Sequence, residues 1–476
     1  MYFSSMTFLW MFLPITIFLY FIIQHFENIF PWGGNLVLLT ASLIFYAWGE
    51  PVYVILMLLS IGINFVSGLE LETHIRAGNM AKAKTACIVT AVINFLILGF
   101  YKYYGFLIEN LNTVLPFDIP YKELALPIGI SFYTFQTMSY VIDVYRGKVM
   151  AQHDPIAFGA YVSMFPQLIA GPIVRYSDVE RQLKKRTISW ERFGEGSVWF
   201  LRGLGKKVLI ANNIGSIYES IISLGIPQMS ALTAWIGCFA YTMQIYFDFG
   251  GYSDMAVGLG KMLGFDFMRN FDYPYISKSI TEFWRRWHIS LSSWFKEYVY
   301  IPLGGNRGGT PKAIRNLMIV WMLTGLWHGA AWNFILWGLY YGIILCLEKY
   351  VLGDVLERFP QAARHVYTII LVMFGWVLFF SPSLGGAASY LGAMFGIGGK
   401  GLIDMTGFYY LKSSLMLGII AGIGSTPLVY RKFSELIWRE ERYMQIVSVV
   451  MYAGIFLIST AYLVNDTYNP FLYFRF

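Results

Sequence analysis

The sequence carries little charge for its length. Only 13% of its 476 residues are Asp, Glu, Lys or Arg, whereas 57% are hydrophobic and 18% are aromatic. Soluble globular domains carry roughly 25% charged residues, so this composition excludes a soluble protein of several domains. Apolar runs of about 18 residues or more recur along the whole chain, and a transmembrane helix needs a run of that length. The chain is therefore expected to cross a membrane many times.

Cysteines and metal-ligand patterns are also scarce. The three cysteines, Cys87, Cys238 and Cys346, lie in apolar stretches without metal-ligand spacing. They are expected to be small core residues, and no metal site is expected. The sequence has no G-x-S-x-G elbow either, so a hydrolase has no support. No internal repeat is evident, and an inverted-repeat transporter is therefore not favoured.

The net charge of +7 does not indicate binding to nucleic acid. The basic residues fall in loops between apolar runs, and the positive-inside rule places such loops in the cytoplasm. The loop 74–84 contains Arg76, Lys82 and Lys84, so the three spans before it put the N-terminus outside. The N-terminus lacks a basic region and a small-residue cleavage site, so it is expected to be a retained first span. The expected location is the cytoplasmic membrane of the cell, among its lipids.

The predicted fold class is all-α: a polytopic integral membrane protein with roughly 10–12 spans plus re-entrant and interfacial helices. Residues 1–476 are expected to form a single transmembrane domain. The expected spans are Thr7–Ile23, Asn35–Trp48, Val52–Leu69, Ala86–Ile108, Leu126–Val144, Lys206–Leu224, Leu232–Phe247, Leu317–Trp327, Trp332–Leu347, Val366–Phe380, Phe408–Ile423 and Ile446–Val464.

One apolar segment, Phe158–Val174, does not fit the alternation of loops. Basic residues flank it on both sides, although a span would have to bring the chain to the opposite face. The segment contains Pro166, Gly171 and Pro172, which interrupt a helix. It is therefore expected to be re-entrant, surrounded by protein or lining a cavity.

The most motif-rich part of the chain is 246–338. Within it, Asp248 and Asp254 flank a Gly-Gly pair in largely apolar sequence, which predicts a bent or discontinuous membrane helix. Carboxylates at membrane depth usually find a partner or line a polar route. An interfacial turn with both aspartates in water is the alternative, and the sequence does not choose between the two.

Two histidines of this part lie among tryptophans. The segment Ser279–Lys296 opens with a capping box, with Ser279 at the N-cap and Glu282 at N3, and its apolar stripe predicts an amphipathic helix in the cytoplasmic interface. His288 sits at the edge of that stripe. His328 lies in a segment apolar enough to cross a bilayer, and a titratable group at that depth indicates a functional site. The alternative is a histidine that only hydrogen-bonds a neighbouring helix.

Several segments together resemble the membrane-bound O-acyltransferase family. The likeness rests first on FWRRWHISLSSWFKEYVYIPLGGNR (Phe283–Arg307) and LTGLWHGAAWNFILWG (Leu323–Gly338). It is strongest to the bacterial members that acetylate alginate and other surface polysaccharides, and it extends from the first residues to the last. Further matching segments are MYFSSMTFLWMFLP, LPIGISFYTFQTMSYVIDVYRG, FPQLIAGPIVR, YFDFGGYSDMAVGLG and NPFLYFRF.

The resemblance implies an O-acetyltransferase with a multi-helix membrane fold. It makes His328 the catalytic residue and places His288 at the family's second histidine position. A neutral imidazole can take the proton from an attacking hydroxyl while a thioester or ester is opened. The expected donor substrate is acetyl-CoA, with no tightly bound cofactor. The expected acceptor is an extracytoplasmic polysaccharide, reached with the help of an exported, esterase-like acetyltransferase as partner protein.

Further residues are candidates for the route of the donor or the acceptor. Arg285 and Arg286, with Lys296, could hold donor phosphates, although such side chains often only anchor a helix at the interface. Tyr473, in the aromatic tail, could carry the acyl group as an ester, although an aromatic belt is the ordinary role of such residues. The candidates for the path are Asp248, Asp254, Trp327, Asn333, Arg285 and Arg286.

Two other functions stay open at this point. D-alanyl transfer to teichoic acid, or acylation of a lipid or a protein, would keep the family and change the cargo. A non-enzymatic transporter or channel would use His328 and the aspartates to line a pathway.

Overall fold

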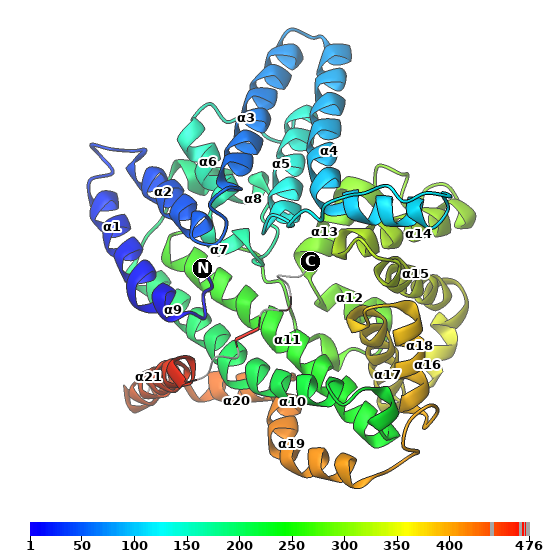
Figure 1. Ribbon diagram of the computed structural model, residues 1–476. Helices are drawn as coiled ribbons and strands as arrows, with labels where there is room; N and C mark the ends of the chain where they lie inside the picture. Colours follow the sequence, from blue (N-terminus) through cyan, green and yellow to red (C-terminus); the bar gives the residue numbers. More distant parts are fainter. Residues whose placement is uncertain (438–441, 466–468, 471, 473–476) are drawn as a thin grey trace. The chain divides into compact units, whose positions relative to one another are not determined.

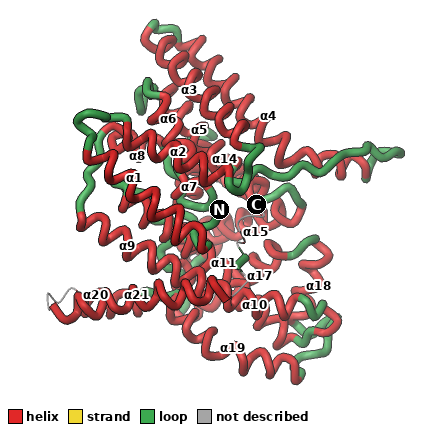
Figure 2. Tube along the Cα trace, turned by 60° about the vertical axis from the view of Figure 1, so that its left-hand side comes forward, coloured by secondary structure: helices red, strands yellow, loops and turns green. Residues whose placement is uncertain are grey.

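The computed structural model describes residues 1–437, 442–465, 469–470 and 472. All regular structure in these residues is helical, and they contain no β-strand (Figures 1 and 2). The prediction of an all-α protein is therefore confirmed. The helices form two compact units, one of Met1–Phe200 with Met255–Met268, the other of Leu201–Asp254 with Arg269–Phe476. The expectation of one domain over the whole chain stays a prediction.

Polar side chains join neighbouring helices in the first unit. In α3 (Val54–Arg76) and α4 (Met80–Asn112), the buried side chains of Asn64 and Asn94 exchange amide hydrogen bonds of 3.0 Å each. Between helices in lipid, such bonds supply attraction that apolar contact alone does not. The other helices of this unit are η1 (Phe8–Phe12), α1 (Leu13–His25), α2 (Gly33–Ala47), α5 (Ile130–Tyr145), α6 (Pro155–Ser163), α7 (Phe165–Leu168) and α8 (Tyr176–Lys184).

The second unit contains most of the motif-rich part of the sequence. Two helices, α9 (Trp190–Gly205) and α11 (Ala231–Met262), contribute residues to both units. The remaining helices all belong to the second unit: η2 (Lys206–Ala211), α10 (Asn212–Ile222), η3 (Ile226–Gln228), η4 (Pro274–Ile276), α12 (Ile280–Arg286), α13 (Ile289–Phe295), η5 (Lys296–Tyr300), α14 (Thr310–His328), α15 (Trp332–Leu347), η6 (Glu348–Leu352), α16 (Gly353–Arg358), α17 (Gln361–Phe380), α18 (Leu384–Met394), α19 (Met405–Gly424), α20 (Leu428–Ile437) and α21 (Arg442–Asn465).

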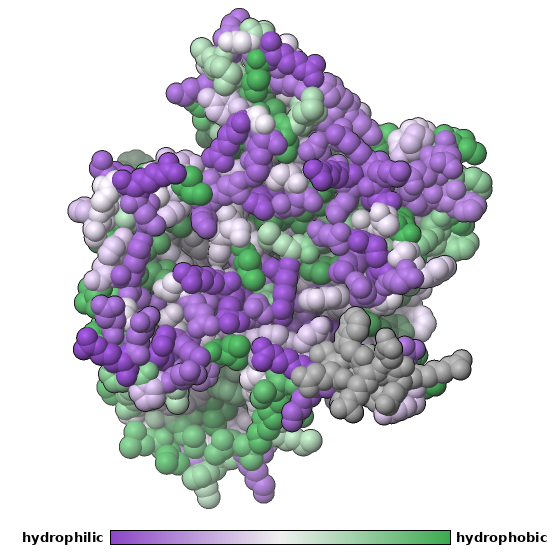
Figure 3. Space-filling model, turned by 180° about the vertical axis from the view of Figure 1, so that it is seen from behind, coloured by the Kyte–Doolittle hydropathy of each residue, from purple (hydrophilic) through white to green (hydrophobic). Residues whose placement is uncertain are grey.

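Seven helical segments of the described chain are long and apolar enough to cross a membrane. Large apolar side chains lie exposed on them, and Figure 3 shows apolar side chains (green) at the surface. Lipid tails, unlike water, tolerate such a surface. The other expected spans fall outside these seven segments, so the total of roughly 10–12 spans stays a prediction. The seven segments are Phe8–His25, Val54–Arg76, Met80–Asn112, Trp332–Arg358, Gln361–Phe380, Met405–Gly424 and Gln445–Asn465.

The segment expected to be re-entrant is buried and interrupted. It forms α6 and α7, which are nine and four residues long, followed by a non-helical stretch that leads to α8. All residues from 157 to 174 are buried. Neither helix is long enough to cross a bilayer, and irregular backbone is tolerated at membrane depth when protein surrounds it. The arrangement supports a re-entrant segment, and the side from which it enters stays a prediction.

The Gly250–Gly251 pair does not interrupt its helix. The sequence predicted a bent or discontinuous helix here, but α11 is continuous from Ala231 to Met262, so the discontinuous form is wrong. A Cβ on Gly251 would lie 2.8 Å from the carbonyl oxygen of Gly203 in α9. The missing side chain lets the two helix backbones approach closely, which is the usual role of small residues between membrane helices.

The predicted amphipathic helix is interrupted at His288. Its start is predicted correctly, because Ser279 is the N-cap of α12 and its hydroxyl accepts a hydrogen bond from the Glu282 N–H at 3.0 Å. Its continuity is wrong, because His288 has left-handed backbone angles of φ 45° and ψ 54° between α12 and α13. The apolar stripe stays buried on both sides of the break, so the interruption redirects the chain without exposing the stripe.

Candidate active site

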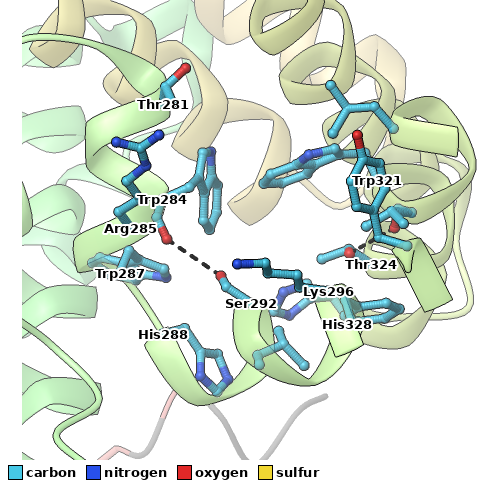
Figure 4. A pocket seen from close by; sticks show the side chains of 15 residues that line it. Thr281, Trp284, Arg285, Trp287, His288, Ser292, Lys296, Trp321, Thr324 and His328 are labelled. Carbon is cyan, nitrogen blue, oxygen red and sulfur yellow. Dashed lines mark hydrogen bonds between the residues drawn. The ribbon is translucent and has the colours of Figure 1, made fainter. Parts of the chain in front are cut away.

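A cavity of about 250 Å³ lies within the second unit, with walls from α12, α13, η5 and α14. Its lining is mainly apolar and aromatic, with a few polar groups, as is usual for a binding pocket. Figure 4 shows His288 and His328 in the lower part of the cavity, beneath the indoles of Trp284 and Trp321. The lining residues are Thr281, Trp284, Arg285, Trp287, His288, Leu291, Ser292, Phe295, Lys296, Tyr300, Leu317, Val320, Trp321, Thr324 and His328.

His328 is the last residue of α14 and lies against an aromatic wall. Its side chain is buried, and its ring centroid lies 4.9 Å from that of Trp327, 4.9 Å from that of Trp337 and 5.3 Å from that of Phe379. One side of the imidazole faces the cavity, and these three rings restrict its movement on the others. His328 thus lies deep in the protein and next to a cavity, and its catalytic role stays a prediction.

Close packing of α14 against α15 positions His328. A Cβ on Gly325 would lie 2.3 Å from the carbonyl oxygen of Phe334, and a Cβ on Gly338 would lie 2.2 Å from that of Trp321. Only glycine at these positions allows the two helices to come so close together. The end of α14, and with it the imidazole, is therefore fixed against the start of α15.

His288 is held by Asn270, a residue that the sequence analysis did not single out. The carboxamide oxygen of Asn270 lies 3.1 Å from Nδ1 of His288, and it accepts hydrogen bonds from the N–H and the hydroxyl of Ser290 at 3.1 and 2.9 Å. The carbonyl oxygen of Asn270 accepts a further bond from the N–H of Ile289 at 3.0 Å. These contacts support the left-handed backbone of His288, which costs an L-residue about 1–3 kcal/mol.

The network assigns the tautomer of His288. The N–H of Ser290 can only donate, so the atom of Asn270 that it contacts is the oxygen, and Nδ1 of His288 must supply the hydrogen of its own bond. Nε2 then carries the lone pair. Burial lowers the pKa of His288 from 6.5 to about 3, so the ring is neutral at physiological pH.

One indole connects the two histidines. The ring centroid of Trp327 lies 5.9 Å from that of His288 and 4.9 Å from that of His328. Trp327 is buried between them and lies outside the set of residues that line the cavity. The structure therefore brings together three of the residues that the sequence predicted, with Trp327 as a packing element rather than a part of the cavity wall.

The two adjacent arginines have different surroundings. Arg285 is exposed and lines the cavity with Lys296, so both cations can reach an anion at its mouth. The guanidinium of Arg286 instead forms ion pairs with Glu282 at 3.0 Å and Asp272 at 3.2 Å. Arg286 thus holds α12 to the loop before it, and only Arg285 keeps the position expected of a residue on the donor path.

Asp248 and Asp254 both lie in α11 and both have lysine partners. Asp248 pairs with Lys207 at 2.6 Å, and Asp254 pairs with Lys206 at 2.6 Å. The interfacial turn with solvated aspartates is therefore wrong, since all but Lys206 of these residues are buried. Neither carboxylate lines the cavity, but Phe249, next to Asp248, has its ring centroid 4.8 Å from that of His288.

Asn333, a further candidate, falls outside the cavity wall. The side-chain amide of Asn333 donates to the carbonyl oxygen of Ser381 at 3.0 Å, which ties α15 to the end of α17. Its environment is that of a packing residue. Tyr473 lies outside the described residues, although part of the tail before it is described and contacts Asp248 through the N–H of Leu472 at 2.9 Å.

Sequence patterns missed the residues that hold the site. Asn270 and Lys207 are single polar residues, distant in sequence from the groups they contact, and no local motif marks either. Trp284 is part of a quoted motif and Trp321 falls in an expected span, but helical periodicity gives neither residue a role in a cavity. Within the described ranges, no three His, Cys, Asp or Glu side chains come together as a metal site.

The chain is similar to known proteins over most of its length. The sequence model of the membrane-bound O-acyltransferase family matches residues 148–389, which include both histidines. A probable alginate O-acetylase of Azotobacter vinelandii is 43% identical over 85% of this chain and 80% of its own length. A peptidoglycan O-acetyltransferase of Helicobacter pylori is 34% identical over 85% of this chain and 81% of its own. A teichoic acid D-alanyltransferase of Bacillus subtilis is 31% identical over 48% of this chain and 60% of its own.

Proposed function

Because this chain belongs to the membrane-bound O-acyltransferase family, and is therefore a multi-pass membrane acyltransferase, we propose that it O-acetylates a cell-surface polysaccharide. The proposed donor is acetyl-CoA from the cytoplasm, and the proposed acceptor is a polysaccharide hydroxyl on the outer side of the cell membrane. Two relatives that cover most of this chain are named O-acetylating enzymes of alginate and peptidoglycan, which are both polysaccharides or contain one.

The observation that carries the proposal is the position of His328. A buried imidazole, fixed by aromatic rings, faces a cavity whose lining also includes the cations Arg285 and Lys296. Phosphates of a nucleotide thioester would contact these cations, since charge-assisted hydrogen bonds to phosphate are strong. The mainly apolar wall would exclude water and so protect the thioester from hydrolysis.

We infer the following chemistry for the transfer. His328 accepts the proton of the attacking hydroxyl while its oxygen forms a bond to the acetyl carbon. The carbon–sulfur bond of the thioester then breaks, and the proton passes to the departing thiolate, so an ester and a free thiol are formed. Trp284 is part of the cavity lining, and its indole N–H has no acceptor among the described residues. In the proposed reaction this N–H donates a hydrogen bond to the carbonyl oxygen of the thioester.

The substitution His328→Ala tests the role of the base. Loss of a general base usually lowers the rate about 10²–10⁴-fold. Ester-linked acetate, released by mild alkali from the surface polysaccharide of complemented cells, is the quantity to measure. Detergent-extracted protein level and a single gel-filtration peak provide the control for folding. Wild-type acetate in cells that make the variant would remove His328 from the mechanism.

The proposal includes a hand-over at the C-terminal tail. The phenol of Tyr473 is the first acceptor, so an aryl ester forms with release of CoA, and an exported esterase-like partner then moves the acetyl group to the polysaccharide. An aryl ester is a reactive donor, which makes the second transfer favourable. Tyr473→Phe keeps the ring and removes the hydroxyl. A relay predicts loss of polysaccharide acetate, whereas a plain interfacial anchor predicts none.

The identity of the acyl donor distinguishes O-acetylation from D-alanyl transfer. Membranes that contain the protein should release CoA from labelled acetyl-CoA and should not accept a D-alanyl carrier protein. The D-alanyltransferase relative matches only about half of this chain, and family membership removes the non-enzymatic transporter. The proposed topology keeps the N-terminus outside, as the basic loops predict.

A further inference from the structure

The described part of the C-terminal tail is held by three polar contacts in the second unit. The N–H of Leu472 donates to Oδ2 of Asp248 at 2.9 Å, and the Lys207 ammonium donates to the carbonyl oxygen of Pro470. The side-chain amide of Asn212 donates to the side-chain oxygen of Asn469 at 3.2 Å. Two of these contacts go to backbone groups of the tail, so they fix the path of the chain independently of its side chains.

The two charged groups that hold the tail also hold each other. Lys207 and Asp248 are each 2% exposed, and their ion pair measures 2.6 Å. A buried pair needs further hydrogen bonds to offset the loss of water. Here the tail supplies them, since it presents an acceptor to the lysine and a donor to the aspartate. The tail thus directs a carbonyl oxygen at the positive member of the pair and an N–H at the negative member.

The pair also lies next to the candidate active site. Phe249 follows Asp248 in α11, and its ring centroid lies 4.8 Å from that of His288. Asp248 therefore joins the tail on one side to the aromatic surroundings of His288 on the other. A membrane anchor at the end of a chain would need no such contact, because an aromatic side chain at the interface is sufficient.

We propose that the Asp248–Lys207 pair is a clamp that holds Pro470 and Leu472, the tail residues it contacts, and so positions the tail for the acyl hand-over. This inference rests on the proposed function, in which Tyr473, the residue after Leu472 in sequence, accepts the acetyl group. Asp248 and Lys207 are positioning residues, because they act on the tail and take no part in the bond changes.

An apolar replacement of the pair separates the clamp from a merely structural ion pair. Replacing both members of a buried pair with residues of similar volume is often neutral or stabilising. Lys207→Met with Asp248→Leu should therefore fold. Hydrogen exchange of a peptide from the tail should become at least tenfold faster in this double variant, and polysaccharide acetate should fall at least tenfold. Lys206→Met with Asp254→Leu, on the same two elements, should leave tail exchange unchanged.

A change in the tail itself gives the second test, and it leaves the pair intact. Leu472→Pro removes the N–H that donates a hydrogen bond to Asp248, whereas Leu472→Ala keeps this N–H. The proline variant should show faster tail exchange and reduced acetate, and the alanine variant neither. A chain that carries Leu472→Pro together with the apolar double variant should lose no more acetate than either variant alone, because each variant removes the same interaction between the tail and the pair.

The outcomes distinguish the clamp from the proposed function. Wild-type tail exchange in Leu472→Pro would overturn the clamp, and so would wild-type acetate in a proline variant whose tail exchanges faster. Both results can occur while His328→Ala abolishes acetylation, and the proposed function would then stand without the clamp. Wild-type acetylation in His328→Ala would remove the proposed function itself, whatever the tail does.

Discussion

The carboxamide oxygen of Asn270 accepts hydrogen bonds from the segment that carries His288, and removing it tests how the site is held. Its donors are Nδ1–H of His288 and the N–H and hydroxyl of Ser290, at 2.9 to 3.1 Å. A buried donor left without an acceptor costs about 1–3 kcal/mol. The Ser290 hydroxyl can turn to another acceptor, and it also lies 3.5 Å from Nδ1 of His288. The bond lost outright is that of the Ser290 N–H, so Asn270→Ala should destabilise the protein by about 1–3 kcal/mol.

The same substitution should reduce acyl transfer, because it removes the acceptor that sets the tautomer of His288 and helps to orient its ring. Removal of the partner that orients a functional histidine typically costs about 10–100-fold. Asn270→Asp gives a sharper readout. The carboxylate keeps the acceptor and adds a negative charge, which favours the imidazolium and raises the pKa of His288 above its value of about 3. Activity should then be lost on the acid side at a pH at least one unit higher than in the wild type.

The assay is acetyl transfer from acetyl-CoA in membrane vesicles, measured as a function of pH, with thermal unfolding in detergent alongside. Asn333→Ala is the matched control: this residue is also buried in the second unit, and its amide donates to the carbonyl of Ser381. It should lower stability without moving the acid limb. An unshifted acid limb in Asn270→Asp, together with wild-type turnover in Asn270→Ala, would refute the role assigned to Asn270.

Three further results are expected. The free energy of unfolding should fall by about 2 kcal/mol from pH 7 to pH 5, because His288 gains a proton near pH 6.5 in the unfolded chain and only near pH 3 in the folded one. His288→Gln should lack this part of the pH dependence, and an equal pH dependence in the variant and the wild type would contradict the prediction. In a cysteine-free chain, an impermeant maleimide added to intact cells should label Gly385→Cys and spare Lys185→Cys, both at exposed positions; labelling of the latter reverses the topology. Arg285→Gln should raise KM for acetyl-CoA about tenfold, whereas Arg286→Gln should mainly lower the unfolding temperature, as measured in detergent. A raised KM in Arg286→Gln but not in Arg285→Gln would show that Arg286, and not Arg285, binds the donor.

Local signals in the sequence predicted what depends on neighbouring residues. The Ser279 N-cap and the buried apolar stripe after it were both predicted, because capping and helical period act within a few residues. The apolar stripe continues at helical period through His288. A helix that breaks at His288 buries the same residues as an unbroken one, so the stripe does not distinguish the two. Periodicity reports which face is apolar and carries no information on one backbone angle, so the break could not be predicted.

Interactions between distant segments were predicted only in kind. A partner for Asp248 was one of the alternatives that the sequence left open, because an unpaired charge at membrane depth is costly. That the partner is Lys207 follows from the packing of η2 against α11, which no local pattern contains. Likewise, the Gly250–Gly251 pair predicts a bent or discontinuous helix from sequence, although glycine serves both for flexible backbone and for close approach of two helices. Only the position of Gly203 against Gly251 decides between the two.

The left-handed backbone at His288 also sets which replacements this position will accept. At φ 45° a β-branched side chain is strained, whereas glycine is relaxed and asparagine or aspartate is tolerated. For a site as buried as this one, hydrophobicity alone would rank valine and isoleucine above asparagine and glycine. A complete library of variants at position 288, sorted by the amount of folded protein in the membrane, should show that order inverted.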